Sequence, residues 1–136
     1  MSSSISTPTH SPGETVELTG FSLDTLRYYE RIGLIEPVRR AVGGQRRYRE
    51  EDVEWLGVLR CLRDTGMPIA RMREFAEQVR AGDGTFAHRL VLLEEHDRAV
   101  AAQIALLERQ RLRIQEKIEH YRAALSPAGA ASREVP

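Results

Sequence analysis

The chain of 136 residues is long enough for one compact domain with an extension, and too short for two full domains with separate cores. Its 20 basic and 20 acidic residues give a formal net charge of zero, so any basic surface has to be local. The single cysteine, Cys61, excludes an internal disulfide framework and points to a reducing cytoplasm. The sequence shows neither a signal-peptide pattern nor an apolar run of about 18 residues, so we expect no membrane-spanning helix.

The first helix is predicted to follow a Ser/Thr/Pro-rich segment, residues 1–10, which has little to bury and should form a disordered leader. Ser11 precedes Pro12, and Glu14 lies three residues after the serine. This order predicts a helix N-cap, a proline at the first helical position and a capping box. We therefore expect a short helix over residues 13–18.

A second helix is predicted over residues 23–31. The preceding turn, residues 19–21, contains a glycine, as the turns of helix-turn-helix units do, and Ser22 can cap the helix. The spacing directs Leu23 and Leu26 inward. The outward side chains are Thr25, Arg27, Tyr28 and Arg31. Short polar residues and arginines on such a helix are what a DNA major groove would need.

A basic hairpin is predicted after this helix. The glycine pair at residues 43–44 separates two short segments that contain β-branched and aromatic residues, a pattern typical of a hairpin turn. From Arg27 to Arg49 the chain carries seven Arg against two Glu, a formal charge of plus five. A basic surface is thus concentrated on the second helix and the hairpin.

Two more amphipathic helices are predicted next, each with one face toward the core. The helix over residues 51–64 places on that face Trp55, Val58, Leu59 and Leu62. The helix over residues 69–80 places there Met72, Phe75, Ala76 and Val79. Residues 81–84, with two glycines, are predicted to be a linker.

The longest predicted helix covers residues 85–125 and carries a seven-residue repeat. At about 1.5 Å per residue it reaches on the order of 50 Å, more than the globular part can cover. The repeat is typical of a coiled coil, so the helix needs a partner, most simply a second copy of the chain. The members of this seam are Leu90, Leu93, Asp97, Val100, Ile104, Leu107, Arg111, Ile114, Ile118, Tyr121 and Leu125.

Two charged residues interrupt the seam. Asp97 and Arg111 each lie seven residues from Ile104. In an antiparallel pairing centred near Ile104 they would approach each other across the interface and fix its register. The alternative is that both side chains turn outward to water, as long charged side chains readily do.

The segment LDTLRYYERIGLIEPVRR, residues 23–40, resembles the DNA-binding half of the MerR family of bacterial transcription regulators. The likeness extends through the glycine hairpin, the pair Arg47-Tyr48 and the acidic helix start at residues 50–52, and covers about residues 11–80. One departure is Pro12, where the family has an aliphatic residue. This departure argues against the family's short first strand.

The resemblance implies a mainly α fold: a winged helix-turn-helix domain with a small β-hairpin wing, followed by a long dimerisation helix that forms an antiparallel coiled coil. It also implies a cytoplasmic, nucleoid-associated bacterial protein that binds a pseudo-palindromic promoter as a homodimer, works with RNA polymerase, and activates or represses by distorting the promoter spacer. The expected organisation is a leader (1–10), a DNA-binding domain (11–80), a linker (81–84), a dimerisation helix (85–125) and a disordered tail (126–136).

The predicted DNA contacts divide into two groups. Phosphate contacts are expected from Tyr28, Arg31, Arg39, Arg40, Arg47 and Tyr48, and base-edge contacts from Thr25 and Arg27. Ser22 and Arg46 complete the predicted set.

Cys61 leaves two hypotheses open. It lies off the predicted core face between Arg60 and Arg63, whose charge would favour a thiolate, and the surrounding sequence resembles the aldehyde- and electrophile-responsive MerR subgroup, in which one cysteine of this helix is thought to be the sensor. The alternative is a small buried packing residue, as lone cysteines often are.

No enzyme, cofactor or metal site is predicted. The sequence contains no phosphate loop and no nucleophile elbow, and His88 and His96 lie more than two helical turns apart. Two rival functions remain: an excisionase-like or architectural winged-helix protein without an effector, which needs no five-heptad seam, and a coiled-coil protein that binds another regulator, which needs no basic wing.

Overall fold

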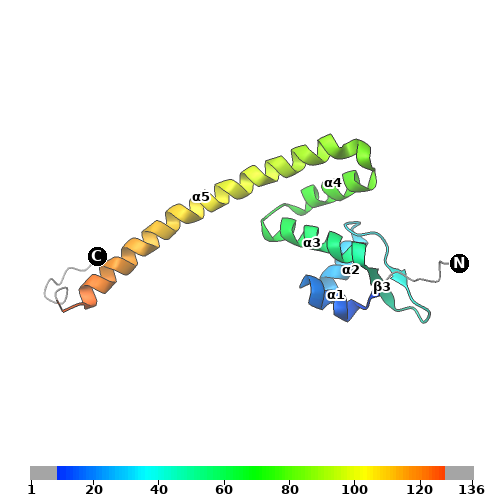
Figure 1. Ribbon diagram of the computed structural model, residues 1–136, viewed down its shortest axis with the longest axis horizontal. Coiled ribbons are helices and arrows are strands. Elements are labelled where there is room, and N and C mark those ends of the chain that lie inside the picture. The colour runs from blue at the N-terminus through cyan, green and yellow to red at the C-terminus, as the bar shows by residue number, and fades with distance from the viewer. Residues whose placement is uncertain (1–8, 128–136) are drawn as a thin grey trace. The chain divides into compact units, whose positions relative to one another are not determined.

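The computed structural model describes residues 9–127, and the chain divides after Glu94 into two compact units (Figure 1). The predicted mainly helical fold with a hairpin wing and a long C-terminal helix is confirmed. In chain order the elements are β1 (Thr9–His10), α1 (Pro12–Thr19), α2 (Leu23–Arg31), β2 (Arg39–Arg40), β3 (Arg46–Arg49), α3 (Glu50–Asp64), α4 (Ile69–Arg80), the 3-10 turn η2 (Asp83–Thr85) and α5 (Phe86–Leu125).

The starts of α1 and α2 are set by the predicted serine caps. At α1 the Ser11 hydroxyl accepts from the backbone N–H of Glu14 at 3.1 Å, and the Glu14 carboxylate accepts from the backbone N–H of Ser11 at 2.7 Å. At α2 the Ser22 hydroxyl accepts from the backbone N–H of Thr25. Each bond satisfies an amide that a helix start leaves unpaired, so both helices begin where the sequence directs.

The turn between α1 and α2 is held by α3. Gly20 adopts a left-handed conformation with φ of 77°, and the Arg60 guanidinium occupies the space that a Cβ would need. That guanidinium donates to the backbone carbonyl of Thr19 at 2.8 Å. The turn thus requires glycine for both its φ and the approach of Arg60.

The three short strands form one antiparallel sheet in the order β1-β3-β2. The prediction that Thr9 and His10 belong to a disordered leader is wrong, because they pair with Arg49 and Tyr48 on β3. Pro12 does not prevent this strand, since the proline lies two residues beyond it in the first turn of α1. The rest of the predicted leader and the end of the predicted tail, residues 1–8 and 128–136, lie outside the described residues.

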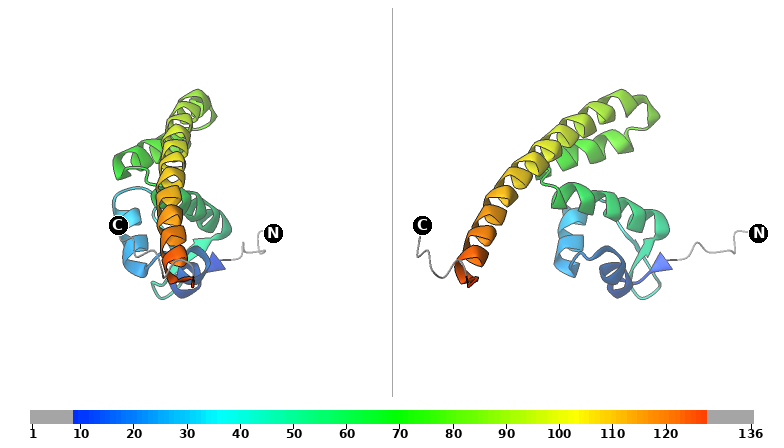
Figure 2. Two further views of the ribbon diagram at one scale, coloured as in Figure 1. Left: turned by 90° about the vertical axis from the view of Figure 1, so that its left-hand side faces the viewer. Right: turned by 60° about the vertical axis from the view of Figure 1, so that its left-hand side comes forward.

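The four helices α1, α2, α3 and α4 share one core with strand β3, and Figure 2 shows these elements grouped around α3. Its buried apolar residues include Phe21, Leu26, Tyr29, Leu34, Tyr48, Leu56, Leu59, Leu62, Met72 and Phe75. Two orientations predicted from the sequence are wrong: Leu23 and Val58 are exposed. Leu56 is fully buried in place of Val58, so the core-facing side of α3 is turned by part of a helical turn from its predicted centre.

Arg89, in the first turns of α5, ties that helix to the end of α4. It donates to the backbone carbonyl of Gly82 at 2.6 Å and to the Thr85 hydroxyl at 2.9 Å. Longer bonds reach the carbonyls of Gln78 and Val79. A cation near the C-terminus of a helix satisfies carbonyls that the helix leaves free, so Arg89 helps to fix the connection at residues 81–85.

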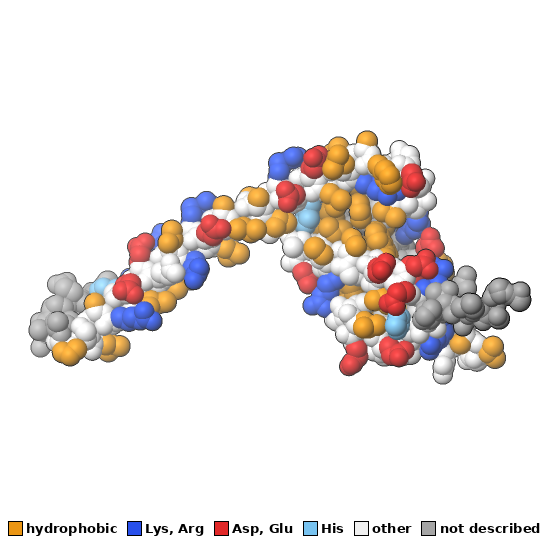
Figure 3. Space-filling model, viewed as in Figure 1, with side chains coloured by type: hydrophobic (Ala, Val, Ile, Leu, Met, Phe, Trp, Pro, Cys, Tyr) orange, Lys and Arg blue, Asp and Glu red, His pale blue; other side chains and the backbone are white. Residues whose placement is uncertain are grey.

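The second unit begins within α5, and its helical side chains are largely exposed in the single chain. Ile104 is 51% exposed, and Leu107, Ile114, Ile118 and Tyr121 are likewise exposed. Figure 3 shows hydrophobic side chains recurring along this helix. Within the described residues, no helix is both long and apolar enough to cross a membrane.

Candidate nucleic-acid interface

The outer face of α2 presents polar, aromatic and basic side chains to solvent. The Arg27 side chain is 57% exposed, with a long ion pair of 3.8 Å to the exposed Asp24. Tyr28 is 41% exposed, and the Arg31 guanidinium lies over its ring at 5.4 Å. The opposite face buries Leu26 and Tyr29. Packing on one face therefore leaves Arg27, Tyr28 and Arg31 on the other, as predicted for a recognition helix.

The predicted base-contact residue Thr25 is only partly accessible. Its backbone N–H and its hydroxyl both bond the hydroxyl of exposed Ser22, at 3.1 and 3.0 Å. The bonded pair forms a polar edge at the start of α2. Both side chains retain acceptor or donor capacity for a ligand.

The wing, residues 39–49, projects a second basic group. Gly43 and Gly44 have φ of 101° and 87°, which a two-glycine hairpin turn tolerates without strain. The exposed Arg40 donates to the backbone carbonyl of Gly44 at 3.0 Å. The backbone of Arg39 belongs to β2, while its side chain is not among those that the structure describes.

The recognition helix and the wing meet around an open hollow of about 510 Å³. Three arginines line it, together with a glutamine of the wing and two residues at the start of α1. The lining residues are Ser11, Pro12, Arg27, Arg40, Gln45 and Arg46. The exposed Arg27 and Arg40 side chains provide hydrogen-bond donors and positive potential of the kind that binds phosphate oxygens, whereas Arg46 pairs with Glu30 and the start of α1 is closed by its capping box. This hollow is therefore a candidate anion-binding surface of the first unit.

Three residues predicted to contact DNA are engaged within the chain instead. Tyr48 is 1% exposed, so the prediction that its side chain contacts phosphate is wrong for this conformation. Burial raises the pKa of the Tyr48 hydroxyl, while a hydrogen bond from Arg46 lowers it. Arg47 donates to the hydroxyl and carbonyl of Thr9, and Arg46 pairs with Glu30 at 3.2 Å. Alternation along a strand gave no means of separating these inward arginines from the outward ones.

Cys61 lies on the surface of α3. Its exposure in the single chain contradicts the hypothesis of a buried packing residue. The neighbouring arginines are already paired: Arg60 bonds Asp64 at 2.9 Å and Arg63 bonds it at 3.2 Å. The hydrogen bond from Arg60, then that from Arg63, holds the pKa of Asp64 below its usual value despite desolvation. The positive charge expected to favour a thiolate is therefore partly offset.

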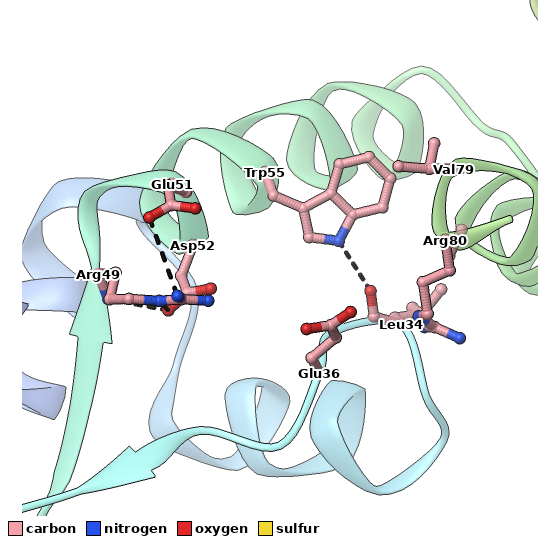
Figure 4. A pocket seen from close by; sticks show the side chains of 9 residues that line it. Leu34, Glu36, Arg49, Glu51, Asp52, Trp55, Val79 and Arg80 are labelled. Atoms are coloured by element: carbon pink, nitrogen blue, oxygen red, sulfur yellow. Dashed lines mark hydrogen bonds and ion pairs between the residues drawn. The ribbon is translucent and has the colours of Figure 1, made fainter. Parts of the chain in front are cut away.

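A small pocket of about 270 Å³ lies between α3, the end of α4 and the chain after α2 (Figure 4). The Trp55 indole N–H donates to the backbone carbonyl of Leu34 at 2.8 Å, and its ring stacks on Phe75. The rim of the pocket carries charges of both signs, since Arg49 pairs there with Asp52 and Glu51. This pocket could not be predicted from the sequence, because its walls come from three separate segments.

The histidines do not gather into a metal site. His88 pairs with Glu74 at 3.1 Å, and this hydrogen bond is the main cause that lowers the pKa of that carboxylate. Over residues 9–127 no group of three or more His, Cys, Asp or Glu side chains is placed to hold a metal ion.

The recognition helix, the wing and their basic hollow define a winged helix-turn-helix DNA-binding protein. The family model of the MerR HTH family regulatory proteins matches residues 11–79. An HTH-type transcriptional regulator of Haemophilus influenzae is 34% identical to the chain over 128 residues, covering 94% of this chain and 95% of that relative. The chain therefore belongs to the MerR family and is a DNA-binding transcriptional regulator of the MerR type.

Further relatives and solved structures agree. The HTH-type transcriptional regulator AdhR of Bacillus subtilis is 40% identical over 82 residues, 60% of this chain and 59% of that relative. The structure of HiNmlR, a MerR family regulator lacking the sensor domain and bound to promoter DNA, is similar with a TM-score of 0.78 and 37% identity, covering 86% of this chain and 93% of that one. The structure of a MerR family regulator from Listeria monocytogenes is similar with a TM-score of 0.80 and 33% sequence identity, covering 90% of this chain and 92% of that one.

Proposed function

We propose that two copies of the chain bind a pseudo-palindromic promoter, each placing α2 in a major groove and its wing on the neighbouring backbone. The observation that carries this proposal is the convergence of Arg27 and Arg40 on one basic hollow, together with the exposure of Tyr28 on the same helix as Arg27. The base-edge contacts fall to Thr25 and Arg27. Phosphate contacts fall to Tyr28, Arg31, Arg39 and Arg40, with Arg46 and Arg47 held in the wing behind them.

The exposed seam of α5 supports an antiparallel homodimer. Pairing centred on Ile104 brings Leu90 of one copy opposite Ile118 of the other, and Asp97 opposite Arg111. Both apolar residues are exposed in the single chain, as an interface awaiting its partner would be. The ion pair would fix the register. If Asp97→Leu and Arg111→Leu both left dimer stability and helix orientation unchanged, the charges would have no such role.

A binding experiment tests the main proposal. We expect the chain to run as a dimer in light scattering and to bind duplexes with inverted half-sites, with affinity that falls steeply as salt rises. A duplex carrying one half-site, and one with both half-sites scrambled, serve as controls. A monomer at micromolar concentration, or equal binding to all three duplexes at low salt, would contradict the proposal.

We further propose that bound dimers regulate by distorting the promoter spacer while RNA polymerase is present. This mechanism follows the family likeness, since two half-sites held at a fixed separation make the duplex follow the protein. In vitro transcription from promoters that differ only in spacer length tests it. The dimer should activate from an over-long spacer and repress or leave unchanged a spacer of ordinary length; equal effects on both would exclude distortion. Such a protein would act in the cytoplasm, associated with the nucleoid.

A response to an aldehyde, electrophile or oxidant at Cys61 is the finer proposal. It is supported by the exposure of that thiol and by the sequence likeness to the electrophile-responsive subgroup. Transcription is measured against formaldehyde, methylglyoxal, a quinone and diamide, for the wild type, Cys61→Ser and Cys61→Ala. Loss of the response in both variants supports a sensor; unchanged responses in both remove Cys61 from the mechanism and leave the effector-free alternative.

A further inference from the structure

The acidic residue Glu30 lies on the recognition helix, next to the surface to which the proposed function assigns DNA, and the inference below rests on that proposed function. A carboxylate there repels phosphate, so simple electrostatics makes it unfavourable for DNA binding. Its side chain is only 18% exposed, however, and points into the joint between α2 and the wing. The cost of placing a charge in that joint calls for a compensating role.

Glu30 contacts the wing at two points. Its Oε2 accepts from the backbone N–H of Val38 at 3.1 Å, in the segment that leads into β2. Its Oε1 pairs with Arg46 Nη1 on β3 at 3.2 Å. Both of these paired atoms are buried, and neither has a hydrogen-bond partner among the described residues, so each depends on the other for compensation of its charge.

Strand β3, which carries Arg46, is anchored both to β1 and to the core. Next to Arg46 on β3, Arg47 anchors the strand to β1 through Thr9. The ring of Tyr48, two residues beyond Arg46, is fully buried in the core. Glu30 is the acidic side chain through which α2 joins this network, so it couples the position of the wing to the recognition helix itself.

We infer that Glu30 is a positioning residue for DNA recognition: by holding Arg46 and Val38, it sets the distance between the base-contacting face of α2 and the phosphate-contacting wing. Arg46 thereby has an internal role in place of the phosphate contact expected for an arginine of the wing. Arg40 and the wing backbone are presented to the duplex at a separation that Glu30 determines.

This inference predicts that neutralising Glu30 weakens operator binding, whereas charge repulsion alone predicts that it strengthens binding. Glu30→Gln preserves shape and an acceptor for Val38, but leaves the buried Arg46 cation unpaired. We expect operator affinity to fall on the order of tenfold and the salt dependence to become shallower as wing contacts are lost. The matched control is Glu36→Gln, which removes the same charge from an exposed position nearby and should leave affinity unchanged or slightly raised.

Hydrogen exchange on the free dimer supplies a readout that does not depend on DNA. Peptides covering residues 37–47 should exchange faster in Glu30→Gln than in Glu36→Gln or the wild type. If Glu30→Gln does not fold, Arg46→Gln tests the same joint from the other side and should show the same loosening. Affinity equal to or tighter than wild type in Glu30→Gln, or unchanged wing exchange in the folded variants, would overturn the inference.

A double-variant cycle completes the test. If Arg46 merely bound phosphate and Glu30 merely repelled it, the two substitutions would have opposite and additive effects on affinity. A joint instead predicts that Glu30→Gln with Arg46→Gln binds better than the sum of the two losses allows, because two neutral amides can bond each other. Strict additivity would contradict the joint.

Discussion

The two units of this chain differ in whether their apolar side chains are buried. In the first unit, residues such as Leu26, Leu56 and Leu59 are fully buried, and charges near the surface are paired within the chain. In the second unit, Ile104, Leu107 and their neighbours on the repeat are exposed. The core of the first unit is formed within the chain, whereas the proposed dimer would cover the exposed apolar residues of the second unit. If the proposed dimer forms, the shape of each DNA-binding surface depends on packing within one chain, and the separation of the two surfaces depends on association.

The largest expected effect comes from a charge at the centre of the repeat. Ile104→Asp replaces an apolar residue that a symmetric antiparallel pairing places opposite its own copy, so two carboxylates would meet. Burying an isoleucine contributes about 1.5–3 kcal/mol, and the change occurs in both chains. We expect a monomer in analytical ultracentrifugation and a loss of operator affinity beyond a hundredfold.

The control for this variant lies one residue away. Gln103→Asp adds the same charge on the exposed surface outside the repeat and should leave the dimer intact. Thermal unfolding of the first unit should be unchanged in both variants, because its core contains no residue beyond Leu92. A dimeric Ile104→Asp variant would show that the repeat is not the interface.

The second prediction reverses the comparison by weakening the self-contained unit. Leu26 is fully buried, so Leu26→Ala should lower the free energy of unfolding by about 2–5 kcal/mol, measured by urea denaturation. Leu23→Ala, on the same helix but exposed, should cost less than about 1 kcal/mol. Association through α5 should persist in both variants. Equal losses for the two leucines would mean that α2 packs through a different face.

These leucines also show which features of the fold can be predicted from the sequence and which cannot. Caps, turns and helix bounds depend on neighbouring residues, so Ser11, Ser22 and the glycine pair of the wing predicted their elements. The rotation of a helix on the core depends on distant partners. Thus the helical spacing predicts Leu23 and Val58 to face inward although both are exposed, and it does not identify Leu56, whose burial depends on how other segments pack around α3.

The site was predictable to a similar depth. The arginine count and the recognition helix indicated DNA binding, but alternation along β3 could not show that Tyr48 enters the core or that Arg46 and Arg47 turn to Glu30 and Thr9. Strand β1 was missed for a related reason. Two residues carry almost no local signal, and their partner lies some 40 residues away on β3.

A third prediction concerns the exposed face of α2. Arg27→Ala and Tyr28→Ala should each weaken operator binding by about 1–3 kcal/mol, while the dimer and the unfolding free energy remain near wild type. Arg73→Ala, an exposed arginine on α4, controls for the loss of one positive charge. Fluorescence anisotropy with a labelled operator measures the difference. Wild-type affinity in both α2 variants would exclude this face as the DNA-binding surface.

The smallest effect tests how the start of α1 stabilises the first unit. Ser11→Ala removes the cap hydroxyl and should lower the unfolding free energy by about 1 kcal/mol. The same cap also predicts a pH dependence, which Glu14 tests. Hydrogen bonds from the Ser11 backbone N–H, then from its hydroxyl, lower the pKa of Glu14 below its ordinary value of 4.5. A carboxylate with a depressed folded pKa stabilises the fold above its unfolded pKa, and this contribution is lost as pH falls through the folded value. Urea titrations between pH 7 and pH 3 should therefore show wild type and Glu14→Gln converging below about pH 4.5. Ser11→Ala should leave association through α5 unchanged at neutral pH, since the cap acts within the first unit alone; a weakened dimer would show that the two units are coupled through more than their shared helix.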